Sequence, residues 1–178
     1  PGEESGTLVF TGSMDWMPNE DGILYFVGEI LPLIRARLPE TKLLVVGRKP
    51  GSRIRALADN DPLIEITGRV EDIRPYVARG SVYVVPLRVG SGTRLKIFEG
   101  MAMGKAIVST TIGAEGLPVT SGNDIVLADG ERRFADEVCA LLTSADRRLH
   151  IGIGARKLVE DNYSWAAVAK HLELAIRK

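Results

Sequence analysis

The sequence predicts an α/β protein: one doubly wound domain of three layers, α/β/α, with helices on both faces of a mostly parallel six-stranded sheet. Apolar segments of strand length alternate with segments of helix length along the chain, which is typical of βαβ units. The segment SVYVVP over residues 81–86 is apolar without alternation, as are strands covered on both faces. A length of 178 residues suits a single domain.

The first half of the chain contains three strand–helix units. Strands are predicted over residues 7–12, 42–47 and 63–67, and helices over 18–38, 50–59 and 71–79. Pro18 suits the first turn of the first helix because its φ is already close to the helical value. Pro32 lies inside that helix, so we expect a bend or an interruption there.

The second half continues the same alternation. Strands are predicted over residues 81–86, 106–109 and 124–127, and helices over 94–103, 131–143, 146–162 and 165–177. Two sets of three right-handed units predict the strand order 3-2-1-4-5-6. The first and fourth strands are then neighbours, so the loops after Gly12 and Pro86 should face each other across one ligand-binding crevice.

Composition and charge exclude several classes of protein. Lys plus Arg and Asp plus Glu number 23 each, and a formal net charge of zero argues against a general nucleic-acid binder. No apolar run approaches the roughly 18 residues of a membrane span, and residues 1–6 lack the features of a signal peptide. The single cysteine, Cys139, fits a reducing compartment, so we expect a cytoplasmic protein.

Some residues that often carry chemistry are not candidates here. His150 and His171 have no partners at metal-ligand spacing, so no metal site is predicted. Cys139 lies between apolar residues of an amphipathic helix and is predicted to be a core residue. The segment GSGT over residues 90–93 has neither the spacing of a P-loop nor that of a dinucleotide fingerprint.

The loop after the fourth strand is the strongest candidate site. Gly90 and Gly92 allow close approach of the backbone to a ligand, and the loop leads into a helix whose N-terminus favours anions. Arg88, Arg94 and Lys96 add cations at a helix end where cations are unfavourable unless an anion binds. This pattern predicts a phosphate or diphosphate site, and the alternative is a surface turn with solvated basic residues.

Glu99 follows on the same helix, with Leu95 and Ala102 as its neighbours one turn away. We therefore expect it on an apolar face, where a carboxylate needs a hydrogen-bond partner. A ribose offers two vicinal hydroxyls that a carboxylate can accept from. The alternative is an internal salt bridge to Arg94 or Lys96.

Loops after the other strands should line the same edge of the sheet. The segment GSMDWMPN over residues 12–19 can touch phosphate or sugar. Trp16 would stack on a ligand, pack on a partner domain or pack beneath the loop. Asp15 and Asn19 are candidates for capping the next helix. The segments at 47–48 and 68–71, which include Arg69 and Val70, are either nucleoside contacts or ordinary turns. Glu115 is a weaker candidate for a sugar contact.

These motifs together resemble a known family. The segment VVPLRVGSGTRLKIFEGMAMGKAIVST over residues 84–110 resembles the donor-binding, C-terminal half of family 4 retaining glycosyltransferases of the GT-B fold, the glycosyl transferases group 1. The segments at 12–19, 46–47, 68–70 and 163–165 fall where that family has its corresponding features. The resemblance covers nearly the whole chain and implies one Rossmann-like domain over residues 1–178.

The resemblance also implies a function and a set of site residues. The domain would bind a nucleoside-diphosphate sugar, with Glu99 on the ribose hydroxyls and the Gly12 loop on the phosphate side. Arg94 and Lys96 would be the catalytic cations that neutralise the leaving diphosphate, with no metal or cofactor. The implied donor-binding residues are Gly12, Ser13, Arg69, Val70, Gly90, Ser91, Gly92, Thr93 and Glu99.

Two departures and one absence qualify the resemblance. Ser91 stands eight residues before Glu99, where the family often has a Glu that contacts the donor sugar, and Ser13 and Asn19 stand near the family's usual phosphate-binding Arg and Lys. The family's N-terminal acceptor-binding domain is absent from this sequence, so we expect the domain alone to be inactive. Any peripheral membrane association would come through the full-length protein. The alternatives are a non-catalytic nucleotide-binding module and a nucleotide-sugar epimerase of the same fold.

Overall fold

The computed structural model describes residues 2–90, 92 and 94–164. Six strands form one sheet in the order β3-β2-β1-β4-β5-β6, and every neighbouring pair is parallel. The strands are β1 (Thr7–Thr11), β2 (Lys42–Val46), β3 (Ile64–Ile66), β4 (Val82–Val85), β5 (Ile107–Ser109) and β6 (Val126–Leu127). The predicted strand order is confirmed, and the sheet is entirely rather than mostly parallel in the part described.

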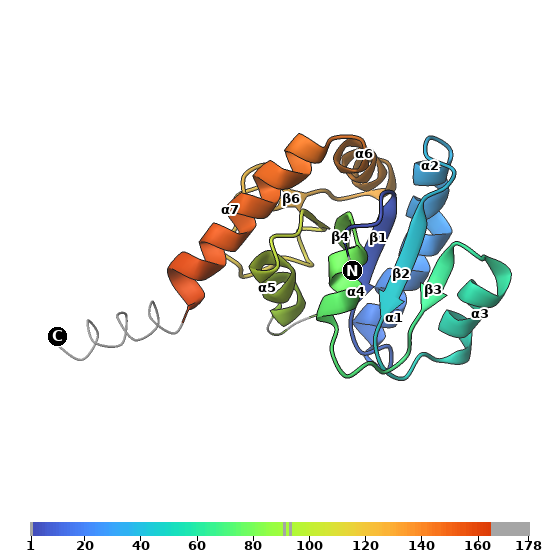
Figure 1. Cartoon of the computed structure of the whole chain (residues 1–178). Coiled ribbons are helices and arrows are strands. Elements are labelled where there is room, and N and C mark those ends of the chain that lie inside the picture. Colours follow the sequence, from blue (N-terminus) through green and yellow to red (C-terminus); the bar gives the residue numbers. More distant parts are fainter. Residues whose placement is uncertain (1, 91, 93, 165–178) are drawn as a thin grey trace.

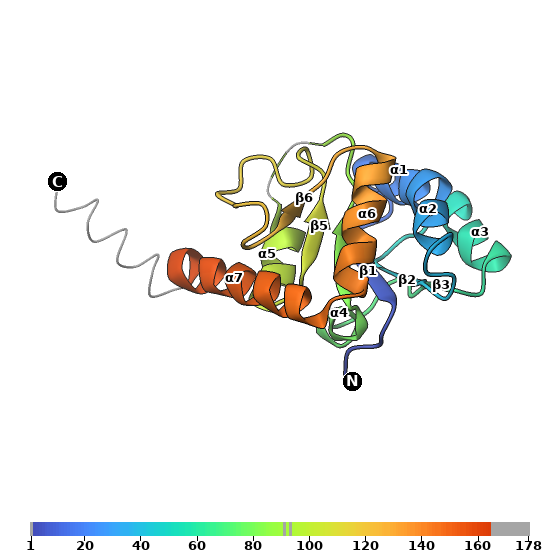
Figure 2. The ribbon, with the colours of Figure 1, turned by 90° about the horizontal axis from the view of Figure 1, so that it is seen from above.

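Helices cover both faces of this sheet, as the three-layer prediction requires (Figure 1; Figure 2). One face carries α6 (Glu131–Leu142), which packs on the elements η1 (Phe26–Ile30) and α2 (Leu31–Arg35). The other face carries α5 (Leu95–Ala102), and α7 (Ala145–Tyr163) packs against it. The remaining helices are α1 (Met17–Tyr25), α3 (Ser52–Asn60) and α4 (Arg74–Arg79).

The sheet is the centre of the hydrophobic core. The side chains of β1, β2 and β4 are almost completely buried, apart from exposed Lys42 at the start of β2. Strands enclosed by helices on both faces need apolar residues at every position, which explains why their sequences do not alternate. Cys139 is buried in this core on α6, as predicted, and His150 is exposed on α7.

The first helical segment is interrupted as its proline predicts. Residues 17–35 form α1, then a π-helical turn, then α2 with Pro32 in its first turn. Pro32 has no amide hydrogen to donate to the carbonyl one turn back, so the regular ladder cannot continue through it. Pro18 lies in the first turn of α1, also as predicted.

Several predicted bounds are wrong by a few residues. The first helical segment ends at Arg35 rather than 38. The helix predicted over 71–79 begins only at Arg74, because the Asp72 carboxylate accepts the Arg74 backbone N–H at 2.9 Å and holds the preceding residues in a turn. The last strand is shortened to Val126–Leu127. The helix predicted over 165–177 lies outside the described residues.

Candidate functional site

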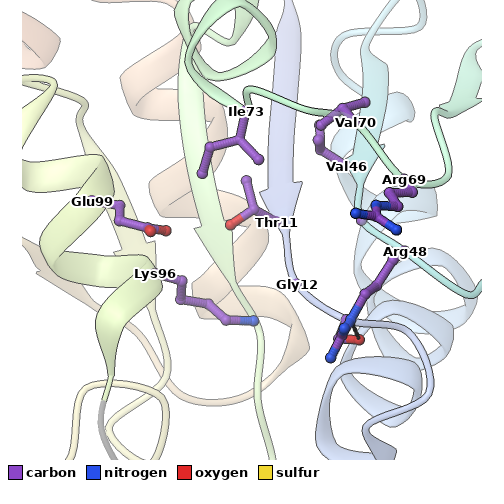
Figure 3. Close-up of a pocket in the computed structure, with 11 residues that line it drawn as sticks. Thr11, Gly12, Val46, Arg48, Arg69, Val70, Ile73, Lys96 and Glu99 are labelled. Carbon is purple, nitrogen blue, oxygen red and sulfur yellow. Dashed lines mark hydrogen bonds between the residues drawn. The ribbon is translucent and has the colours of Figure 1, made fainter.

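A pocket of about 330 Å³ opens at the carboxyl edge of the sheet, where β1, β2 and β3 end next to α5 (Figure 3). Side chains from α5 project into it from one side, and residues of the loops after β2 and β3 lie opposite. We call this the first pocket. It is lined by Thr11, Gly12, Ser13, Val46, Gly47, Arg48, Arg69, Val70, Ile73, Lys96 and Glu99.

Two glycines permit the close packing of the pocket floor. A Cβ on Gly12 would lie 2.7 Å from Nδ2 of Asn19 and 2.9 Å from Nζ of Lys96. A Cβ on Gly47 would lie 1.7 Å from the carbonyl oxygen of Gly12. Any side chain at either position would displace the backbone or the polar groups beside it, so the spacing of the loop depends on both glycines.

Lys96 extends from the first turn of α5 to the end of β1. Its Nζ donates a hydrogen bond to Oδ1 of Asn19 at 2.5 Å and lies 4.2 Å from the centre of the Phe10 ring. No carboxylate of the described residues lies within ion-pair distance of it. Burial, followed by the charge of Arg94, lowers the pKa of Lys96 to about 7, and Glu99 opposes the shift. Lys96 is therefore a cation without a protein anion.

Glu99 lies one turn further along α5 and faces the first pocket (Figure 3). Its side chain is exposed there, so the prediction that it lies on an apolar face is wrong. The predicted alternative of an ion pair with Arg94 or Lys96 is also absent among the described residues. Desolvation raises the pKa of Glu99, and the Lys96 charge opposes this shift. The carboxylate keeps its hydrogen-bonding capacity for a ligand.

Arg48 and Arg69 form the opposite wall of the first pocket and are both exposed. Nε of Arg48 donates to Oγ of Ser13 at 2.9 Å, and Ser13 in turn hydrogen-bonds to Asp15. Asp15 also pairs with Lys49 at 2.8 Å. The Lys49 and Ser13 bonds lower the pKa of Asp15 to about 2, so it is ionised at neutral pH. This chain of polar contacts joins the loops after β1 and β2.

A second pocket of about 240 Å³ adjoins the first. The two share Gly12, Ser13 and Lys96, so they meet where the β1 loop faces the start of α5. The second pocket is otherwise lined by Trp16, Pro18, Asn19, Leu87, Arg94, Leu95 and Gly113. An elongated ligand with an anionic group in its middle would span both pockets across the shared residues.

Arg94 is the buried cation of the second pocket, with 7% of its surface exposed. One of its terminal nitrogens, Nη2, donates to the carbonyl oxygens of Gly90 at 3.0 Å and Ile112 at 2.8 Å. The same nitrogen lies 3.5 Å from Glu115, whose side chain is 72% exposed. Nε is buried without any hydrogen-bond partner. A buried guanidinium with an unused donor is a costly arrangement.

The two interpretations of the basic loop, as an anion site and as a surface turn, apply to different residues. Arg88 is a solvated surface residue, paired with Asp21 at 2.6 Å and stacked 4.4 Å from the ring centre of Tyr25. Arg94 and Lys96 are not solvated in this way, so the surface-turn interpretation is wrong for them. Gly90 and Gly92 adopt positive φ values of 132° and 100°, and neither is among the lining residues of the first or the second pocket.

Most of the predicted site residues come together. Gly12, Ser13, Arg69, Val70, Lys96 and Glu99 line the first pocket, and Arg94 lines the second. Ser91 and Thr93 lie outside the described residues. The prediction omitted Thr11, Val46, Ile73 and Asn19. Only Thr11 carried a signal in the sequence, as a polar residue at the end of an apolar strand.

The loop after β1 differs from its prediction in detail. Trp16 is 56% exposed and lines the second pocket, so it does not pack beneath the loop. Asp15 and Asn19 do not cap α1, which has no side-chain cap. Asn19 instead donates from Nδ2 to the Ser13 carbonyl oxygen at 2.8 Å. Its amide therefore connects the loop to Lys96.

The described residues contain neither a metal-binding cluster nor a membrane-spanning helix. No group of three or more His, Cys, Asp or Glu in residues 2–90, 92 and 94–164 is arranged to hold a metal ion. Within the same residues, no helix combines the length and apolarity needed to cross a membrane. His171 lies outside the described residues.

Comparison with known proteins agrees with this geometry. A GDP-mannose-dependent mannosyltransferase of Corynebacterium glutamicum is 26% identical over 153 residues, covering 80% of this chain and 40% of that protein. The S. aureus TarM structure, a complex that includes UDP, matches 98% of this chain and 36% of its own with a TM-score of 0.77 at 16% identity. A structure of the C-terminal domain of Francisella tularensis LpcC matches 93% of this chain and 88% of its own, with a TM-score of 0.68 at 18% identity.

These likenesses show that the chain shares the fold of the matched parts of these structures. The chain spans about two-fifths of the length of the curated relatives it matches. The family model for glycosyl transferases group 1 matches residues 5–144. The chain therefore belongs to the family of glycosyl transferases group 1.

Proposed function

We propose that this chain is the donor-binding domain of a retaining glycosyltransferase, which moves a sugar from a nucleoside-diphosphate sugar to an acceptor. One observation carries the proposal. Arg94 and Lys96 are two poorly satisfied cations at adjoining pockets, beside a glycine loop at the carboxyl edge of the sheet. A diphosphate supplies the charge and the acceptors that these groups lack.

We assign the donor one orientation, which runs from the first pocket to the second. We assign the nucleoside to the first pocket, with the ribose hydroxyls on Glu99 and the base between Arg69 and Val70. The diphosphate lies at the shared residues Gly12, Ser13 and Lys96. The sugar then extends into the second pocket. Gly90, Ser91, Gly92 and Thr93 remain predicted donor contacts of the adjoining loop.

The same residues supply the chemistry of bond breaking. As the bond between the anomeric carbon and the diphosphate breaks, negative charge grows on the departing oxygen. Lys96 and Arg94 are already held in place and partly desolvated, so they stabilise that charge without reorganising. The first turn of α5 adds its free N–H groups. We propose that this arrangement makes the transfer independent of a metal ion.

The remaining domain of the enzyme is proposed to cover the rim of the second pocket. Large apolar side chains are exposed on the loops and helix starts around it, namely Trp16, Met17, Val89, Leu95 and Ile112. Their position at the carboxyl edge supports an acceptor-binding domain on this side. We therefore propose that residues 1–178 bind donor but need the missing domain for turnover.

We also propose a location for the full-length protein. One curated relative is named for a phosphatidylinositol monomannoside as well as for GDP-mannose. An acceptor of that class would bring the enzyme to the cytoplasmic face of a membrane through its other domain. The donor-binding domain itself would then lie in the cytoplasm.

Calorimetric titration without added metal tests the proposal. The chain is titrated with UDP, GDP and ADP and with their sugar conjugates. Saturable binding of one diphosphate, weakened in Arg94→Ala, is the expected result, and the full-length protein should then transfer the corresponding sugar. Binding without any transfer by the full-length protein would favour a non-catalytic module, and interconversion of the free nucleotide sugar would favour an epimerase.

A further inference from the structure

The contact between α1 and α5 suggests a role for a residue that is neither charged nor part of the predicted site. Asn19 lies in the first turn of α1 and is almost completely buried, with 6% of its surface exposed. Both polar atoms of its side-chain amide form hydrogen bonds. Nδ2 donates to the Ser13 carbonyl oxygen at 2.8 Å, and Oδ1 accepts from Nζ of Lys96 at 2.5 Å.

We propose that Asn19 is a positioning residue that holds the Lys96 ammonium group against the Gly12–Ser13 loop, so that both meet the same diphosphate. The inference rests on the proposed function, because it concerns the same anion site. Asn19 would act through Lys96 and through the loop backbone rather than on the reacting atoms.

The geometry leaves little freedom for another arrangement. The Cα of Gly12 is so close to both partners that a Cβ there would lie 2.7 Å from the Asn19 amide nitrogen and 2.9 Å from the lysine nitrogen. The loop, the amide and the ammonium are therefore packed as one unit. The Lys96 ammonium also lies 4.2 Å from the centre of the Phe10 ring, whose face attracts a cation.

An amide is the side-chain group that suits this position. It offers a donor for the Ser13 carbonyl and an acceptor for the ammonium in one planar group. An aspartate would accept from Lys96, but it would repel the Ser13 carbonyl and offset the charge that the diphosphate needs. A hydrophobic residue of similar size would make neither bond. The neutral acceptor positions Lys96 without cancelling its charge.

The other groups around Lys96 do not provide this support. Its charged neighbours on α5 are Arg94, which repels it, and Glu99, which lies beyond ion-pair distance. Across the first pocket stand the guanidinium groups of Arg48 and Arg69. The β1 and β4 strands contribute Phe10 and the buried Thr11–Tyr83 pair, none of which is charged at neutral pH. Asn19 is thus the one hydrogen-bond acceptor of Lys96 among the described residues.

The role of Asn19 is tested on ligand-free protein, so that the result does not depend on nucleotide binding. Lysine Cε and Hε resonances are followed by NMR across pH 5 to 10 in ¹³C-lysine-labelled protein, and Lys96→Met assigns the signal. Asn19→Leu removes the acceptor and should move the Lys96 midpoint down, whereas Asn19→Asp supplies an anionic acceptor and should move it up, each by about one pH unit. Asn19→Ser, which is smaller than the native residue, gives the downward test if the leucine variant does not fold.

Matched substitutions at Asn60 serve as controls. Asn60 is exposed on α3, and its amide bonds only to the Ala56 carbonyl oxygen at 2.7 Å. Asn60→Leu and Asn60→Asp should leave the Lys96 midpoint unchanged. Folded Asn19 variants whose Lys96 midpoint also stays within 0.2 pH unit of the wild type, a margin of roughly 0.3 kcal/mol, would overturn the inference.

Nucleotide binding then separates this inference from the proposed function. Calorimetry with UDP and GDP at pH 6, where Lys96 is charged, should give about ten-fold weaker binding to Asn19→Leu, the equivalent of one hydrogen bond to a charged group. If wild-type protein binds neither nucleotide, the proposed function fails while the NMR titration still decides the role of Asn19. If wild-type protein binds and Asn19→Leu binds equally well, the positioning role is wrong.

Discussion

The basic residues at the two edges of the sheet differ in their protein partners. At the amino edge, Arg79 donates to Glu4 at 2.7 Å and to Glu65 at 2.8 Å, and these bonds raise its pKa. Lys105 at the same edge donates to the carbonyl oxygens of Ala78 at 2.9 Å and Gly80 at 2.7 Å. Arg79 and Lys105 both have fixed protein partners, which is typical of a structural role.

At the carboxyl edge, Arg94 and Lys96 have fewer or weaker hydrogen-bond and charge partners. Arg94 has a buried Nε without a partner, and Lys96 has a neutral amide where Arg79 has carboxylates. Burial without charge compensation is costly, so it is expected where a ligand supplies the missing charge. The comparison teaches that the partner of a cation, and not the cation alone, distinguishes the proposed binding edge. Lys96 has only a neutral amide there, whereas Arg79 has two carboxylates at the other edge.

The largest expected effect is that of Arg94→Ala. Loss of a charged hydrogen bond to the diphosphate should weaken nucleoside-diphosphate binding by about 1.5 to 3 kcal/mol. Calorimetry gives the affinity, and thermal unfolding followed by circular dichroism shows whether the variant is folded. A folded variant with wild-type affinity would remove Arg94 from the site.

The pH dependence of donor binding tests Lys96. Its pKa in the free protein is about 7, and a bound diphosphate favours the charged form and raises that pKa. Binding should thus be constant below about pH 6 and weaken by up to about ten-fold per pH unit above 7, with proton uptake on binding. Calorimetry in buffers of different ionisation enthalpy, with a nucleotide sugar whose phosphates do not titrate in this range, measures the uptake. The same measurement on Lys96→Met should show none.

Glu99→Gln should have a smaller effect that depends on the ligand. The carboxylate is proposed to accept from the ribose hydroxyls, so the variant should lose about 1 kcal/mol of affinity for a nucleoside diphosphate. It should lose much less for the 2′,3′-dideoxy analogue, which has no hydroxyls to offer. Equal losses for both ligands would place the ribose elsewhere.

At the amino edge, Arg79→Ala should change stability and not binding. Arg79 is largely buried and holds two partly exposed carboxylates, so its removal should cost about 1 kcal/mol of unfolding free energy. Urea denaturation measures the loss. An accompanying loss of nucleotide affinity would contradict the separation of the two edges.

The smallest expected effect on the isolated domain is that of Trp16→Ala. The side chain is 56% exposed, so its removal should change the unfolding free energy by no more than about 0.5 kcal/mol. In the full-length protein the same change should lower transfer to the acceptor, because Trp16 is proposed to lie under the second domain. Unchanged transfer would indicate that the apolar rim is not an interface.

Local patterns were sufficient to predict most of the fold. The apolar runs without alternation identified the central strands, and chain-order rules predicted the strand order that the structure confirms. Element ends were less predictable because single contacts decide them. The Asp72 carboxylate, for example, moves the start of α4 to Arg74.

The candidate site was predictable to the extent that residues follow a strand or open a helix. Gly12, Arg69, Lys96 and Glu99 were identified in this way and line one pocket. Asn19 was interpreted as a helix cap, because the local sequence contains no sign of a partner 77 residues away on α5. The burial of Arg94 depends likewise on carbonyl groups of two different loops.

The sequence by itself determined the fold class, the strand order and the edge of the sheet that carries the site. Those features depend on periodicity and on connection rules, which act on neighbouring residues along the chain. Only the tertiary structure decided which basic residues are satisfied and which are free for a ligand. The hydrogen-bond and ion-pair partners of a side chain, and its burial, depend on segments that are distant in sequence. These segments meet only when the sheet has formed.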